Sequence, residues 1–138
     1  MNFIQLNQQI ILKTGVFGIF MGIITVLGWS KSYEIFIWTI MGVTTTIFLF
    51  YEKLNQIFLH CVIIGLSWGF DCSLIQVIFF DTYTSNNPTF VSGILNFSPN
   101  YPKISLILVG TLFGFIGGMI MFSIIKLVKL IKNCIHDF

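Results

Sequence analysis

The chain contains no arginine, and charged residues of any kind make up only 9% of its 138 residues. A soluble domain typically has about 25% charged residues, so this composition cannot cover a surface that faces water. The net charge is only +2, which is too small to suggest binding to nucleic acid. The scarcity of charge therefore argues against both a soluble domain and a nucleic-acid-binding protein.

Sequence patterns typical of catalytic and metal sites are missing as well. The chain has no pair of histidines at i and i+4, no glycine-rich phosphate loop and no Ser/His/Asp spacing of a known kind. Its three cysteines, Cys61, Cys72 and Cys134, have no paired spacing, which favours free thiols that pack as small apolar side chains. We expect a protein that is not an enzyme and that holds no cofactor or metal.

Apolar sequence, by contrast, is abundant: 56% of the residues are hydrophobic and 16 of them are Phe. Four charge-poor runs stand out, and each has the roughly 17–25 residues that a helix needs to cross a bilayer. These runs are 14–30, 35–51, 57–80 and 104–125. The sequence predicts an all-α polytopic membrane protein, a single membrane domain over 1–138, with helices at about 10–30, 34–51, 56–80 and 104–131.

The connections between these runs differ in length. The first two are short, which predicts that consecutive helices lie antiparallel and adjacent in a bundle of four transmembrane helices. The third, 81–103, is polar but also holds apolar residues, and Asn87-Pro88 can start a short helix. We expect a partly ordered outer loop that lies on the membrane; a contact site for an extracellular partner is the alternative.

All basic residues are lysines, and their distribution predicts the orientation in the membrane. If each run crosses once, five lysines fall on one side (Lys13, Lys53, Lys126, Lys129 and Lys132) and two on the other (Lys31 and Lys103). An excess of lysine in short loops marks the cytoplasmic side. We therefore expect a multi-pass protein of the cell membrane, the inner membrane of a bacterium, with both termini in the cytoplasm.

Small residues recur at helical spacing in every run. Because the hydrophobic effect does not hold helices together in lipid, close backbone contact at such residues must do so. The candidates for helix packing are Gly18, Gly22, Gly42, Gly65, Gly69, Gly110, Gly114 and Gly118. The last three form the longest series. Packing within one chain is favoured for it, and the seam of a homodimer is the alternative.

The third run carries Asp71, the ionisable residue that lies deepest in any run. Ser67 and His60 fall in the same helical stripe, so the three form a candidate proton or cation site with His60 at its cytoplasmic entry. An Asp inside the bilayer costs at least about 2.5–3.5 kcal/mol on insertion scales. We therefore expect Asp71 to point inward and to find a hydroxyl partner. A neutral Asp71 that only fixes the helix register is the alternative.

Small and polar residues occupy the other side of this run, namely Gly65, Gly69, Cys72 and Gln76. A helix with two such faces is shielded from lipid on both sides. The sequence therefore predicts that the third helix lies centrally or faces a partner.

The order of features resembles a family of small bacterial four-helix membrane proteins of uncharacterised function. The similarity rests on Lys13-Thr14-Gly15 at the start of a glycine-rich first run, on Asn87-Pro88-Thr89-Phe90 after a glycine-bearing third run, and on a glycine-rich last run that continues into lysines. The resemblance implies a membrane location. It implies no activity and no site residues.

Two functions remain open from the sequence. The first is a non-enzymatic integral membrane protein, an accessory or structural component whose partners are the lipid bilayer and a second copy or another membrane protein. The alternative is a small proton- or cation-coupled transporter or channel subunit that uses Asp71.

Overall fold

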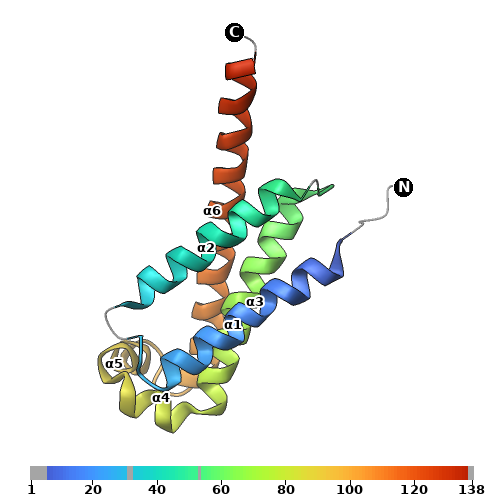
Figure 1. Cartoon of the computed structure of the whole chain (residues 1–138). Helices are drawn as coiled ribbons and strands as arrows, with labels where there is room; N and C mark the ends of the chain where they lie inside the picture. Colours follow the sequence, from blue (N-terminus) through green and yellow to red (C-terminus); the bar gives the residue numbers. More distant parts are fainter. Residues whose placement is uncertain (1–5, 31–32, 53, 137–138) are drawn as a thin grey trace.

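The computed structural model describes residues 6–30, 33–52 and 54–136, with side chains up to residue 134. These residues contain helices and no strand, which confirms the all-α prediction. In chain order the helices are α1 (Gln8–Val26), α2 (Glu34–Tyr51), α3 (Ile57–Ile78), α4 (Phe80–Asn86), α5 (Pro88–Phe97) and α6 (Pro102–His136) (Figure 1).

Four of these helices are long and apolar enough to cross a membrane, namely α1, α2, α3 and α6. Large apolar side chains are exposed along them; Phe36 on α2 is 64% exposed and Phe113 on α6 is 67% exposed. Exposed apolar patches of such extent are rare on soluble monomers and are ordinary on surfaces that face lipid. The structure therefore supports the prediction of a membrane protein with several membrane-spanning helices.

Helix α3 lies between α6 on one side and α1 on the other, the central position that its two small and polar faces predict. Helices that follow one another in the sequence make fewer contacts: α2 meets α6 more than it meets α1. The expectation that consecutive helices pack as nearest neighbours is therefore wrong. The helices that pack together are those with glycines on their facing surfaces, because glycine allows the closest backbone approach. The lengths of the connections do not determine the pairs.

Glycines of α3 and α6 form the tightest seam of the molecule. A Cβ atom built at Gly114 would overlap the carbonyl oxygen of Gly65, and one built at Gly69 would overlap that of Gly110. At Gly118 it would lie 2.5 Å from the carbonyl oxygen of Cys61. Residue numbers rise along one helix as they fall along the other, so α3 and α6 run in opposite directions. We call this contact the glycine seam.

The segment 81–103, expected as a partly ordered loop, holds the two short helices α4 and α5. Pro88 occupies the first turn of α5, as Asn87-Pro88 predicts. Two buried residues of α5, Val91 and Ile94, pack with Tyr83 of α4 and with α1 and α6 in one apolar cluster. Burial and the nearby charge of Glu34 raise the pKa of the Tyr83 phenol. The segment thus packs against one end of the long helices.

Two asparagines fix this segment to the end of α1. The Asn86 side chain donates to the carbonyl of Val26 at 2.8 Å, and Asn87 donates to the carbonyl of Thr25 at 2.9 Å. The last carbonyls of a helix have no partner within it, so these amides satisfy them. The chain then turns at Gly28, whose φ of +69° suits glycine.

Helix α6 is longer at both ends than the predicted 104–131. Its 35 residues correspond to about 52 Å at 1.5 Å per residue, whereas the hydrocarbon core of a bilayer is about 30 Å thick. Its last turns extend beyond the other helices (Figure 1). They carry Lys126, Lys129 and Lys132, all exposed. Lys31 and Lys53, which also entered the prediction of orientation, lie outside the described residues.

Candidate functional site

The contact between α1 and α3 positions the candidate site. The indole N–H of Trp68 donates to the carbonyl of Thr14 at 2.7 Å, and both residues are buried. A Cβ atom built at Gly18 would lie 2.8 Å from the Cα of Trp68, and one at Gly22 would lie 3.1 Å from the carbonyl oxygen of Cys72. Residue numbers rise together along the two helices, so α1 and α3 run in the same direction. Gly18 and Gly22 allow the close approach.

Ser67 and Asp71 lie one helical turn apart on α3, beside Gly15 of α1. A Cβ atom built at Gly15 would be 4.0 Å from both Ser67 Oγ and Asp71 Oδ2. All three residues are partly exposed, and Phe70 next to Asp71 is 44% exposed. The structure thus brings Ser67 and Asp71 together at the outer edge of the contact. We call Gly15, Ser67 and Asp71 the Asp71 surface.

Asp71 does not have the hydroxyl partner that we expected. Within the described residues no hydrogen bond reaches its carboxyl group, and the Ser67 hydroxyl donates to the carbonyl of Ile64 at 2.9 Å instead. Its side chain lies beside Gly15 and Gly18 of α1 and stays partly exposed, so it is not enclosed by the other helices as we expected.

His60 lies apart from this pair, at the beginning of α3. Its side chain is 0% exposed, and both ring nitrogens have backbone partners. Nε2 accepts from the N–H of Asn7 at 3.0 Å, so Nδ1 carries the proton and donates to the carbonyl of Gln56 at 3.1 Å. Eleven residues separate His60 from Asp71, about 16 Å along the helix. The structure therefore places His60 in a contact between the start of α1 and the start of α3, not beside Asp71.

The small and polar residues that we predicted to share one face of α3 contact two different helices. Gly65 and Gly69 face α6, but Cys72 and Gln76 face α1. Gln76 donates to the hydroxyl of Thr25 at 3.0 Å. Figure 1 shows α1 inclined across α3, so the line of contact moves around α3 from the His60 side to the Gln76 side. A fixed stripe at 100° per residue cannot represent an oblique contact.

The remaining predicted residues have different surroundings. Gly42 of α2 has nothing within 4 Å of an added Cβ atom, so no described helix packs on it. Cys61 and Cys72 are buried free thiols on α3, and Cys134 is an exposed one near the end of α6. No group of three or more His, Cys, Asp or Glu side chains that could hold a metal ion occurs in the described parts of the chain.

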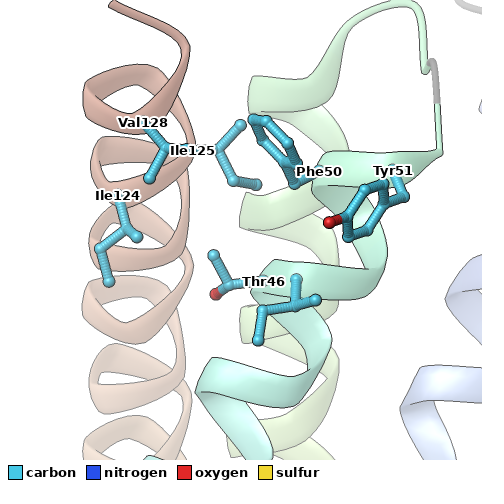
Figure 2. Close-up of a pocket in the computed structure, with 7 residues that line it drawn as sticks. Thr46, Phe50, Tyr51, Ile124, Ile125 and Val128 are labelled. Carbon is cyan, nitrogen blue, oxygen red and sulfur yellow. The ribbon is translucent and has the colours of Figure 1, made fainter. Parts of the chain in front are cut away.

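Sequence reasoning gave no indication of an apolar groove between α2 and α6. Figure 2 shows side chains of both helices around it: Thr46, Ile47, Phe50 and Tyr51 of α2, and Ile124, Ile125 and Val128 of α6. Its volume is about 280 Å³. Thr46 and Ile125 are buried at its base. Helix α2 crosses α6 obliquely (Figure 1), and the two helices separate beyond the crossing. No local sequence signal could have revealed this, because the groove depends on a crossing angle.

No protein-family model matches the chain, and neither curated proteins nor solved structures give a match. The resemblance to small bacterial four-helix membrane proteins stays a prediction.

Proposed function

We propose that the protein is a non-enzymatic component of the cell membrane that works by association, and that the Asp71 surface is where a partner helix binds. The observation that carries the proposal is the position of Asp71, which lies well inside the apolar helix α3, is partly exposed and receives no hydrogen bond from the described residues. In lipid such a group costs about 2.5–3.5 kcal/mol or more. A partner that supplies a donor removes this cost.

A second copy of the same chain is the simplest partner. In a two-fold dimer the same surface of each copy faces the other, and a residue at the symmetry axis meets its own counterpart. With Asp71 at that axis, two carboxyl groups, one of them or both protonated, can hydrogen-bond to each other. Gly15 has no side chain, so the backbone of a partner helix can approach closely next to Asp71. The glycine series of α6 is the weaker candidate for a dimer seam, because α3 already covers it.

The transporter alternative has less support from the geometry. A relay would need groups between His60 and Asp71, but the ring nitrogens of His60 are bonded to backbone atoms at the start of the helix. The groove between α2 and α6 does not include Asp71. The observations therefore favour association over transport. Transport of protons or cations is tested by the flux measurement described below.

Substitutions at the Asp71 surface are expected to separate association from folding. Asp71→Leu should weaken self-association about tenfold. Interhelical hydrogen bonds in membranes contribute roughly 0.6–1.7 kcal/mol each, and the substitution removes two symmetry-related hydrogen bonds from the dimer. Asp71→Asn should keep most of the association, since an amide also pairs with itself. The measurement is energy transfer between labelled copies in vesicles at a series of protein-to-lipid ratios.

Gly15→Ala provides the matched test, because its Cβ atom makes only ordinary contacts at 4.0 Å within one chain. It should leave the chain folded and still weaken association. If the wild type stays monomeric in the vesicles, the second copy is ruled out as the partner. If the wild type carries protons or cations across vesicles and Asp71→Asn abolishes the flux, the transporter hypothesis replaces association.

We further propose that the four membrane-spanning helices alternate in direction along the chain, so that neighbours in sequence are antiparallel and both termini lie in the cytoplasm. The supporting contacts are Asn7 with His60 and the edge-to-face rings of Phe58 and Phe122. They bring the starts of α1 and α3 and the later part of α6 together at one end. The exposed lysines of α6 lie beyond that end. Fluorescent-protein fusions after residue 138 should therefore fluoresce, and alkaline-phosphatase fusions after residue 98 should be active. The reverse pattern would contradict this topology.

A further inference from the structure

The groove between α2 and α6 lies next to a group of lysines on the same face of α6. Ile125, at the base of the groove, is 1% exposed. Lys129 and Lys132 follow it by four and seven residues, so all three lie on one face of the helix. At 1.5 Å per residue the two lysines are about 6 and 10 Å beyond Ile125 along the helix axis. An apolar groove is thus continued by two cationic side chains.

The groove has the character of a site for a hydrocarbon chain. Its lining is aliphatic and aromatic apart from the Thr46 and Tyr51 hydroxyls, and the Thr46 hydroxyl already donates to the carbonyl of Gly42 at 2.7 Å. A volume of about 280 Å³ is below the roughly 300–1,000 Å³ of sites for drug-sized molecules. The groove therefore fits part of a flexible chain better than a compact ligand.

The lysines define the rest of the ligand. Tyr51 ends α2 and lies at the groove, so the groove is at the end of the spanning helices and the lysines lie at the depth of the lipid headgroups. Lysine stems can remain in the apolar layer while their ammonium groups reach the phosphates. Among the described residues, the acidic one near the groove is Glu52, which is exposed at the C-cap of α2. Two lysines beside one acidic residue give this end of the groove a net positive charge, which favours an anionic ligand.

We infer that this groove is a binding site for an anionic glycerophospholipid, with one acyl chain between α2 and α6 and the lipid phosphate at Lys129 and Lys132. A neutral lipid would fill the groove equally well but would gain less from the lysines. Each lysine near an anionic surface contributes on the order of a fivefold gain in binding. Two lysines therefore predict a preference for anionic over zwitterionic lipid of about tenfold to thirtyfold.

The test is native mass spectrometry of the purified full chain with dioleoylphosphatidylglycerol or dioleoylphosphatidylcholine, which have the same acyl chains. The wild type should prefer the phosphatidylglycerol by the factor above. Lys129→Gln with Lys132→Gln should reduce the preference to about twofold or less. The matched control, Lys13→Gln with Lys103→Gln, removes the same charge elsewhere and should retain the preference. Glu52→Gln should increase the preference by a few-fold.

A second pair of variants tests the acyl-chain part of the site. Ile47→Trp fills the groove from its α2 wall and should weaken the binding of both lipids at least fivefold. Ile40→Trp is the control, because Ile40 is similarly exposed on the same face of α2, two turns away and outside the groove. Inorganic phosphate should not compete with the lipid, because it lacks the chain.

Three results would overturn the inference. The first is equal binding of the two lipids by the wild type. The second is an unchanged lipid affinity in Ile47→Trp, which would mean that the lysines attract lipid by charge alone. The third is a dimer from which lipid is excluded and which Ile47→Trp disrupts, since the groove would then hold a second copy of the chain.

Discussion

Gly114→Val is expected to abolish the folded state of the protein. The added Cβ atom would overlap the carbonyl oxygen of Gly65 and would lie 2.9 Å from the backbone nitrogen of Gly69. Backbone atoms of a packed helix cannot rotate away as a side chain can, so α3 and α6 must separate. Overpacking of a core typically costs about 1–3 kcal/mol, and an overlap with backbone should exceed that range.

The matched control is Gly117→Val, three residues further along α6. A Cβ atom at Gly117 meets nothing within 4 Å, and the change in helix propensity is the same for both variants. Size-exclusion chromatography after heating in mild detergent should show a monodisperse peak for Gly117→Val and loss of that peak for Gly114→Val. Equal behaviour of the two variants would mean that the glycine seam does not hold α3 and α6 together.

These two glycines also show how far the sequence can be interpreted without a structure. The four-residue spacing of Gly110, Gly114 and Gly118 identifies a face for close packing, and that face is where the seam forms. The same reasoning treats Gly42 as equivalent, yet nothing packs on it. Spacing shows where a backbone can be approached closely. Whether another helix lies there depends on the arrangement of all the helices.

Asp71 illustrates a second limit. Its depth in an apolar run follows from the sequence, because depth is a matter of counting residues along a helix. Its exposure does not, since exposure depends on where α1 crosses α3. The groove at Ile125 is similar: its apolar lining can be found in the sequence, whereas the separation of α2 from α6 that opens it cannot.

The segment 81–103 was the part whose local structure the sequence described least. Asn87-Pro88 correctly indicates where α5 begins, because both residue types favour the start of a helix. The function of the asparagines as partners for the last carbonyls of α1 could not be predicted, since Thr25 and Asn87 are 62 residues apart. Long-range hydrogen bonds leave no periodic signal in a sequence.

Trp68→Ala is expected to produce the largest loss of stability of any single side-chain truncation at the contact between α1 and α3. The indole ring lies 5.9 Å from the ring of Phe17 and 6.0 Å from that of Trp38, centroid to centroid, and it donates to the carbonyl of Thr14. Truncation of a buried Trp typically costs about 3–5 kcal/mol, because the cavity collapses only in part.

Trp68→Phe separates packing from hydrogen bonding. It retains most of the ring contacts and loses the bond to Thr14, whose net contribution is about 1 kcal/mol, so its loss of stability should be a fraction of that of Trp68→Ala. Trp29→Ala is the control, because Trp29 is 74% exposed and its truncation should have little effect on folding. Thermal stability in detergent should therefore decrease in the order wild type and Trp29→Ala, Trp68→Phe, Trp68→Ala. If Trp68→Ala is as stable as Trp29→Ala, α1 is not held on α3 by this side chain, and the position of the Asp71 surface between the two helices loses its physical basis.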